Sequence, residues 1–205
     1  MKFVIDKHVT QKFLNEEDLL PCEGYCVLCN SIKRFKIFEL QKNPQIDLLE
    51  CDECHIVSAS RIPKEEVLGK VYSEFYERSY YGLNKEKVTM DNYIRLSKHI
   101  KKRIPISDST EELYILDFGG GDGSISCYLS KLINNKKNLK KIHIDVVDYE
   151  AYDRQVDQKI KVKGFKDLSE LPFNRKYNIV VASAIMEHLP NPRNVFHILL
   201  KLLEE

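Results

Sequence analysis

Apolar residues in the second half of the chain form two alternating patterns. Short, nearly continuous apolar runs predict strands, and segments with helical spacing of apolar residues separate them. The predicted strands are Leu113–Phe118, Ile142–Val147, a weaker one over 159–163, and Tyr177–Ala182. The last run is almost wholly apolar, which is typical of a strand buried on both faces of a parallel sheet. We therefore expect an α/β fold with a doubly wound, mostly parallel sheet of about four strands.

Two helices are predicted in this half. Ser124–Ile133 is amphipathic and follows the first strand. Asn191 is a suitable N-cap and Pro192 a suitable first residue for a helix that we expect to continue to Glu205.

The first half of the chain divides into two regions by composition. Residues 1–60 contain five of the six cysteines and short apolar runs that suit small strands. These runs are Phe35–Leu40 and Ile46–Leu49. Residues 61–104 have apolar residues at helical spacing and end before Pro105. We expect three parts: a cysteine-rich module over 1–60, a helical linker over 61–104 and the α/β domain over 105–205.

Charge and composition exclude several classes of function. The chain has 205 residues, of which 32 are basic and 31 acidic, and its formal net charge is +1. A dedicated nucleic-acid binder normally has an excess of basic residues, so we expect no nucleic-acid partner. No apolar run reaches the roughly 18 residues of a membrane span, and the first ten residues lack the apolar core of a signal peptide. We therefore expect a cytoplasmic protein with reduced thiols.

A glycine-rich turn, Asp117–Gly123, joins the first predicted strand of the sheet to its helix. Glycines allow positive φ and close approach of a ligand, and the amides that begin the next helix point toward it. The dinucleotide pattern G-x-G-x-x-G is absent, because serine stands where its third glycine is needed. The motif is instead D-x-G-x-G-x-G, with Asp117, Gly119, Gly121 and Gly123. A carboxylate at Asp117 would repel a pyrophosphate but suits the ammonium group of S-adenosylmethionine, which also carries a sulfonium.

A second acid, Asp148, ends the second predicted strand. In this architecture an acid at that place accepts hydrogen bonds from both ribose hydroxyls of a nucleoside. The alternative is a turn residue that caps the strand. The glycine loop beside it favours the ligand role.

Four ordered segments resemble the successive motifs of class I S-adenosylmethionine-dependent methyltransferases, which have a Rossmann-like fold. They are Leu116–Gly123, Val146–Asp148, Asp167–Phe173 and Tyr177–Pro192. The resemblance implies that Asp167 binds the adenine amino group and that the Leu168 amide binds a ring nitrogen. It also implies that Ser183 and the segment to His188 line the methyl-transfer cleft. Gly120 and Asp122 fill variable positions of the loop.

Two C-x-x-C knuckles lie in the first region, separated by 21 residues. They are Cys26 with Cys29 and Cys51 with Cys54. This spacing is typical of a structural zinc ion held by four thiolates. Disulfides and a redox C-x-x-C are the alternatives, and Cys22 and His55 are spare candidate ligands. The sixth cysteine, Cys127, is interpreted as a small buried residue.

The N-terminal part of the chain resembles a subgroup of the same methyltransferases, in which a zinc module precedes the catalytic domain. Paired tyrosines follow the module, here Tyr80 and Tyr81, and the resemblance implies that they close over the cofactor as a lid. Tyr72 and Phe75 are instead interpreted as core residues. Relatives of this kind modify nucleotide-linked sugars, glycans or other small polar metabolites, which implies such an acceptor here.

Two functions remain open from the sequence. The first is methyl transfer, for which His188 is the candidate general base, while Glu187 is a candidate for ordering the turn. The second is a non-catalytic scaffold that binds a partner protein. We expect further strands to be missing after Glu205, which would leave the fourth strand as an open edge. Self-association through that edge, weak cofactor binding and no turnover by this chain alone are the expected consequences.

Overall fold

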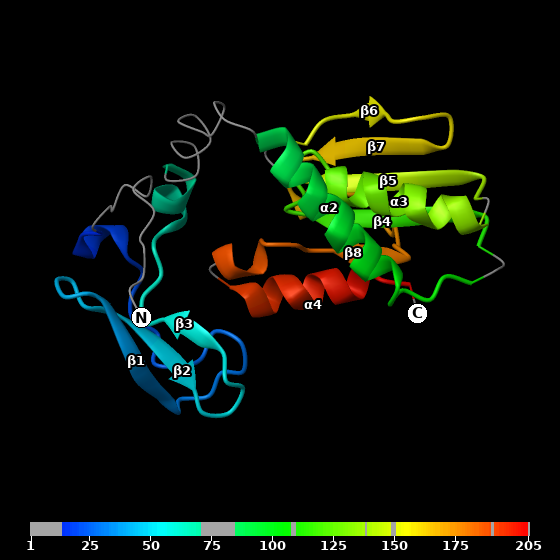
Figure 1. Ribbon diagram of the computed structural model, residues 1–205. Coiled ribbons are helices and arrows are strands. Elements are labelled where there is room, and N and C mark those ends of the chain that lie inside the picture. Colours follow the sequence, from blue (N-terminus) through cyan, green and yellow to red (C-terminus); the bar gives the residue numbers. More distant parts are fainter. Residues whose placement is uncertain are drawn as a thin grey trace. The chain divides into compact units, whose positions relative to one another are not determined.

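The computed structural model describes residues 14–70, 85–107, 110–137, 139–148, 151–189 and 191–204 (Figure 1). The chain divides into two compact units, Met1–Ser79 and Tyr80–Glu205. No helix in the described ranges is long and apolar enough to cross a membrane.

The first unit is built on a three-stranded antiparallel sheet in the order β1-β2-β3. The strands are β1 (Arg34–Gln41), β2 (Ile46–Cys51) and β3 (Val57–Ala59), and a short 3₁₀ turn, η1 (Glu16–Asp18), precedes them. Both strands predicted in this region are confirmed. Residues 65–70 are helical. The remainder of the expected linker up to residue 84, with its four tyrosines and Phe75, lies outside the described residues.

The second unit is a five-stranded sheet in the order β6-β7-β5-β4-β8. The strands are β4 (Glu112–Phe118), β5 (Lys141–Val147), β6 (Arg154–Gln155), β7 (Ile160–Phe165) and β8 (Ile179–Val181). Four of them are parallel, as predicted, while β6 pairs antiparallel with β7. β6 was not predicted, because a strand of two residues is too short to show an alternation of apolar and polar residues. This mixed, largely parallel sheet fits a Rossmann-like fold.

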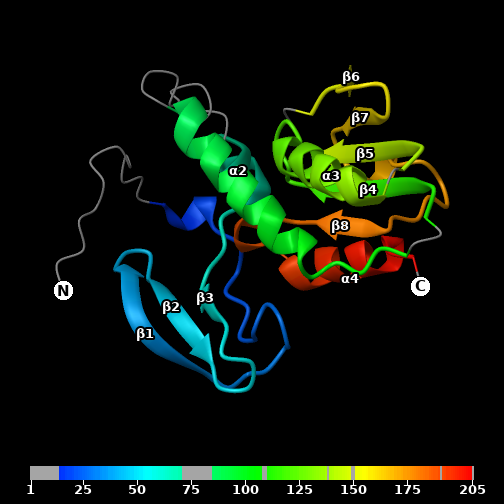
Figure 2. The ribbon, with the colours of Figure 1, turned by 45° about the vertical axis from the view of Figure 1, so that its right-hand side comes forward.

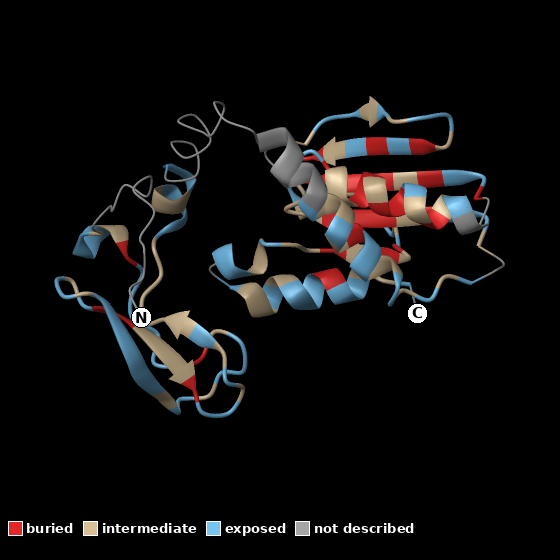
Figure 3. Ribbon diagram, in the orientation of Figure 1, coloured by how far each residue is buried: buried red, intermediate tan, exposed pale blue. Residues whose placement is uncertain are grey.

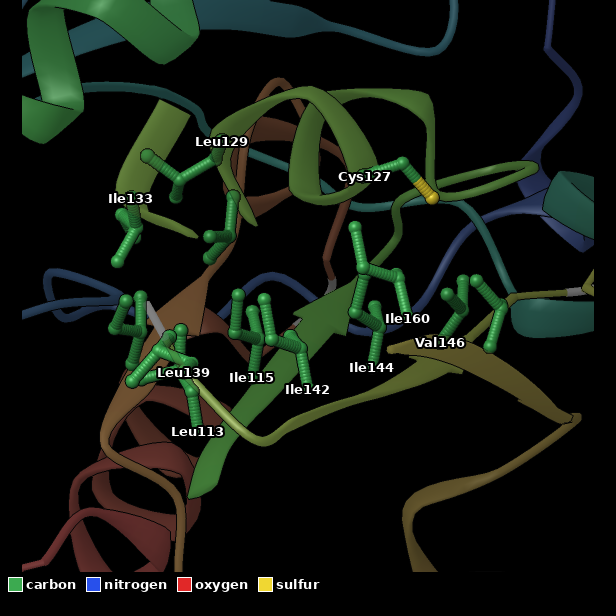
Figure 4. Packing of buried hydrophobic residues seen from close by; sticks show 13 residues of the cluster. Leu113, Ile115, Cys127, Leu129, Ile133, Leu139, Ile142, Ile144, Val146 and Ile160 are labelled. Carbon is green, nitrogen blue, oxygen red and sulfur yellow. The ribbon is translucent and has the colours of Figure 1, made fainter. Parts of the chain in front are cut away.

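Helices cover both faces of the sheet. The helices are α2 (Lys85–Lys101), α3 (Ser124–Lys137) and α4 (Pro192–Leu202), with 3₁₀ turns η2 (Leu168–Glu170) and η3 (Met186–His188). α3 packs against β4 and β5 through a continuous aliphatic cluster, which Figure 4 shows, and Ile100 of α2 packs against the same cluster. α4 packs on the opposite face, where Leu199 meets Leu116 and Tyr177. Figure 2 shows α2 beside α3, and α4 below β8.

Burial alternates where a strand has one covered face. On β7, Ile160 and Val162 are buried while Lys161 and Lys163 are exposed, and the colours alternate along this strand in Figure 3. β5 is more fully buried and carries only one exposed residue, Lys141. The alternation explains why 159–163 was the weakest strand prediction.

The last helix ends earlier than expected. The Asn191 side chain accepts a hydrogen bond from the Asn194 amide and Pro192 is the first helical residue, so the predicted N-terminus is confirmed. However, α4 stops at Leu202 and does not continue to the end of the chain. The physical reason is a new pairing, because Leu203 forms a parallel bridge with Tyr177, whose amide donates to the Leu202 carbonyl at 2.8 Å.

Because Tyr177 is paired in this bridge, the unpaired edge beside β8 begins only after it. The predicted strand Tyr177–Ala182 is reduced to Ile179–Val181, whose outer side has no strand partner among the described residues. On α4, Phe196 and Leu200 are exposed. Self-association through this edge stays a prediction.

Asp145 is a charged residue buried in the middle of β5. It is 2% exposed, and its Oδ2 accepts hydrogen bonds from Arg175 Nη1 and from the Tyr177 hydroxyl, each at 2.8 Å. The Arg175 guanidinium also lies 5.5 Å from the centre of the Tyr114 ring. Burial of a carboxylate is tolerated because both partners are in place. Asp145 thereby holds the segment before β8 against the sheet.

We expect Asp145→Asn to lower the free energy of unfolding by about 3 kcal/mol, because it leaves the Arg175 guanidinium without its charge partner. Urea unfolding measures the loss. Glu111→Gln is the control, since the Glu111–Lys140 pair has a similar separation of 2.7 Å but is exposed and should contribute little. Equal effects of the two variants would contradict a specific role for burial.

Candidate functional site

The glycine loop after β4 has the backbone shape that only glycine adopts without strain. Gly119, Gly121 and Gly123 have φ of 69°, 57° and 75°. The Gly119 amide donates to the Val147 carbonyl at 2.9 Å, which ties the loop to the end of β5. Three of the loop's four glycines are therefore explained by local conformation.

Close packing restricts three glycines, two of which also have positive φ. A Cβ on Gly119 would lie 2.6 Å from the Cβ of Ile185, and one on Gly123 would lie 2.7 Å from Val146 Cγ2. A Cβ on Gly120 would collide with the Asp117 carboxylate. Gly120 was interpreted as a variable position, but the structure requires a residue without a side chain there. No spacing rule could have found this, because it depends on where Asp117 points.

Asp117 lies beneath the loop and is fully buried. Neither of its carboxylate oxygens has a hydrogen-bond partner among the described residues. The pKa of this carboxyl is raised from 3.8 to about 6, mainly by burial; Ser126 lowers it, and the negative charges of Asp148 and Asp122 add to the rise. A buried carboxylate without a partner is costly, so this group is suited to a cationic ligand.

Asp148 directly follows β5 and contacts the loop. Its Oδ2 accepts a hydrogen bond from the Gly121 amide at 2.9 Å, and its own amide donates to the Phe165 carbonyl at 3.0 Å. Both bonds fix the side chain at the carboxyl ends of the central strands. Asp148 and the glycine loop are thus brought together, as the sequence analysis expected.

Asp167 and Leu168 follow β7 at the same edge of the sheet. The Asp167 carboxylate accepts a hydrogen bond from the Ser169 amide at 2.8 Å, and bonding to Ser169 lowers the pKa of this exposed group. Leu168 begins η2 and packs partly into the cluster around Leu116. The bond to the Ser169 amide is sufficient to explain the orientation of the Asp167 side chain in the absence of a ligand.

The segment after β8 returns over the glycine loop. Ser183 is half-buried and Ala184 has a φ of 54°, a turn that brings Ile185 against Gly119. His188 ends η3 with its side chain 45% exposed, and its Nε2 lies 3.9 Å from Glu187 Oε1. Tyr81, the expected lid residue, lies outside the described residues.

Two residues at the loop were not assigned a role from the sequence. Asp122 forms an Asx turn just before α3, because its carboxylate accepts from the Ser124 amide at 3.0 Å and from the Ser124 hydroxyl at 2.7 Å. An aspartate that bonds the backbone two residues later is a recognisable turn signal. Arg154 of β6 donates to Cys127 Sγ at 3.5 Å and lies over the Tyr152 ring at 5.0 Å. Nothing in the local sequence predicts that contact.

The two cysteine knuckles of the first unit have the same backbone geometry. The residue after the second cysteine is left-handed in both, with φ of 62° at Asn30 and 57° at His55. The amides of these residues donate to the carbonyls of Cys26 and Cys51, at 3.0 and 2.9 Å. The side chains of His55 and Cys22 are not part of the cluster that the knuckles form.

The four knuckle sulfurs meet at one point. All lie within 4.8 Å of one another, with Cys26 to Cys54 at 3.7 Å and Cys29 to Cys51 at 3.5 Å. All six cysteines are free, so the disulfide alternative is not supported. Four thiolates around an ion at about 2.3 Å would be separated by about 3.8 Å, close to these distances. The cluster is therefore able to hold a tetrahedral metal ion.

Backbone amides support a negative charge on each sulfur. In every case the amide two residues later donates to the cysteine. The pairs are Leu28 with Cys26, Ser31 with Cys29, Glu53 with Cys51, and Ile56 with Cys54. The Cys54 and Glu53 amides lower the pKa of the Cys51 thiol to about 6, whereas burial and the neighbouring sulfurs outweigh the Ser31 and Ile56 amides and raise the pKa of the Cys29 and Cys54 thiols. Thiolate is the form that binds metals.

Comparison with known proteins identifies the second unit. A family model described as a methyltransferase domain matches residues 81–205, more than half of the chain. Comparison with curated proteins and with solved structures gave no match.

We expect Gly119→Ala to lower the free energy of unfolding by about 2 kcal/mol more than Gly121→Ala. Both glycines have positive φ, but a Cβ on Gly121 meets nothing within 4 Å, so the difference isolates the clash with Ile185. Urea midpoints measure it. Adding Ile185→Ala to Gly119→Ala should remove most of the difference, and an unchanged difference would show that the two residues do not meet.

Proposed function

Because the chain belongs to the family of methyltransferase domains, we propose that it is a class I S-adenosylmethionine-dependent methyltransferase acting on a small polar acceptor. A nucleotide-linked sugar or a glycan is the acceptor class that the sequence resemblance implies. The observation that carries the cofactor assignment is the buried, unpaired carboxylate of Asp117 beneath a loop of left-handed glycines.

The charge of the loop fits this cofactor. Asp117, Asp122 and Asp148 are close enough for the last two to raise the pKa of the first. Such a site repels phosphate groups and favours the ammonium and sulfonium charges of S-adenosylmethionine. The open backbone at Gly121 allows a ligand to approach without meeting a side chain.

We assign the remaining contacts by position. Asp148 would accept from the ribose hydroxyls, while its bond to the Gly121 amide keeps the carboxylate oriented. Asp167 and Leu168 would bind adenine through the carboxylate and the backbone amide. Ser183 and the segment to His188 would line the acceptor side of the site.

The bound cofactor supplies an activated methyl group, which is transferred by direct displacement. The protein therefore contributes mainly by fixing the approach line and excluding water. His188 would accept a proton if the acceptor is a hydroxyl. Its side chain is 45% exposed, and Glu187 is close enough to orient it.

We propose that the four-cysteine cluster holds a structural zinc ion. All four protein ligands are present, and a four-thiolate site has no open position for chemistry. The matching knuckles and the four amide-to-sulfur bonds support a site that is shaped before the ion enters.

S-adenosylmethionine should bind the purified chain in isothermal titration calorimetry, and Asp148→Ala should weaken binding by at least about tenfold through loss of hydrogen bonds to the ribose. Asp157→Ala, an acid in the turn before β7, is the control and should bind as the wild type does. Absence of binding by the wild type would favour the scaffold function, and unchanged affinity in Asp148→Ala would contradict the assigned site.

Elemental analysis of protein purified without added metal should give about one zinc per chain. Cys51→Ser should lose the metal, because three thiolates remain where four are needed. Cys22→Ser is the matched control, since the Cys22 thiol bonds the Ser60 carbonyl instead and lies outside the cluster. A folded first unit without metal would overturn this assignment.

A further inference from the structure

We propose that β1 is a dimerisation edge, at which two copies of the chain pair antiparallel about a two-fold axis and join their three-stranded sheets into one. The sheet of the first unit has the order β1-β2-β3, so β1 is an edge strand (Figure 1). In the described part of the chain, no strand pairs with its outer side. This contact is separate from the association predicted beside β8, and it does not depend on the proposed methyl transfer.

β1 has the features of an edge that another strand can join. It is eight residues long, and six of its positions are exposed. Proteins usually protect such an edge with prolines, unpaired charges or a very short strand. β1 contains no proline. Its central lysine, Lys36, is neutralised, because its Nζ lies 2.7 Å from Asp47 Oδ1 and 3.2 Å from Glu39 Oε2.

Large apolar side chains are exposed along the same strand. They are Phe35, Ile37, Phe38 and Leu40, which are between 45% and 62% exposed. A concentration of exposed apolar side chains on one element is typical of an association surface. Pairing at this edge would bring them into contact with a second strand.

The sequence of β1 is complementary to its own reverse, which identifies the partner as a second copy. We place the two-fold axis between Ile37 and Phe38. The facing pairs are then Phe35 with Leu40, Lys36 with Glu39, and Ile37 with Phe38. Apolar residues face apolar residues and the lysine faces an acid, and the symmetry makes each pair occur twice. Cross-strand pairs of these kinds stabilise antiparallel sheets.

An irregularity in β1 makes this register geometrically possible. Facing residues must lie on the same face of the sheet, but residues three apart in an unbroken strand lie on opposite faces. The register of β1 with β2 shifts between Lys36 and Phe38, which leaves Ile37 as an extra residue. The contact of 3.2 Å between Lys36 and Glu39 shows that both side chains lie on one face. Each can therefore face the other residue of a second copy.

Sedimentation equilibrium of the full chain, with its metal content as purified, tests the proposal. The weight-average mass should rise from 24.0 kDa toward twice that value as the protein concentration is raised over an about hundredfold range. A mass that stays at that of the monomer over the whole range would overturn the proposal.

Charge reversals on β1 locate the contact. Lys36→Glu and Glu39→Lys should each raise the dissociation constant of the dimer at least about tenfold, because like charges then face each other. The double variant Lys36→Glu/Glu39→Lys should return to within about threefold of the wild type, because opposite charges face each other again. Lys64→Glu, at an exposed position of the same unit outside β1, is the control and should leave the dissociation constant unchanged.

A mixture of the two single variants gives the sharpest test. Lys36→Glu carries acids at both positions and Glu39→Lys carries lysines at both, so the two-fold register pairs them with opposite charges at every contact. The mixture should dimerise although each variant alone does not, and a misfolded variant could not be rescued in this way. Failure of the mixture to dimerise, or a dimer that none of the β1 variants weakens, would show that the copies do not meet at this edge.

Discussion

The parallel register between β4 and β5 is the constraint on which the proposed site depends. Phe118 pairs with Val147, and Val147 pairs with Phe165 of β7, so three strands end at one level. Because parallel strands present their carboxyl ends at a common edge, the segments that follow them must meet there. The bond from the Gly119 amide to the Val147 carbonyl extends this register by one residue and begins the loop. A shift of β4 by one residue would turn Asp117 to the other face and remove the loop from Asp148.

The first unit depends on a different interaction, because its described residues form almost no apolar core. Of the apolar residues that the structure describes in this unit, only Leu19, Cys26, Ile46 and Cys51 are buried, and two of these are cysteines of the cluster. Large side chains such as Ile32 and Phe38 are 82% and 62% exposed. A module this small normally needs a metal or disulfides to compensate for the missing core. Since the cysteines are free, the metal-ligating role is the one that the packing supports.

The elements that were predicted correctly are those with a local sequence signal. The four parallel strands, α3 and the N-cap of α4 came from apolar runs and a capping pair, which are local signals. The strand β6, the early end of α4 and the requirement for glycine at position 120 depend on partners distant in sequence. α4 ends before Leu203 because Leu203 pairs with the backbone of Tyr177. Glycine is needed at position 120 because the Asp117 carboxylate lies where a Cβ would be. Such contacts carry no short-range pattern, so the sequence could supply the residues of the site but not the way in which they constrain one another.

The unequal treatment of Asp117 and Asp145 gives the proposed site a physical reason beyond its motif. In folded proteins, buried polar groups generally have hydrogen-bond partners within the same fold. Asp145 follows this rule, and its bonds to Arg175 and Tyr177, which hold the segment before β8 against the sheet, are sufficient to explain why an acid is buried there. Asp117 breaks it at the one edge of the sheet where glycines leave the backbone open and a second acid is held by the loop. A local conflict retained at such a place is understandable if the missing partner comes from outside the chain, because a ligand that binds only the folded state restores the stability that the conflict removes.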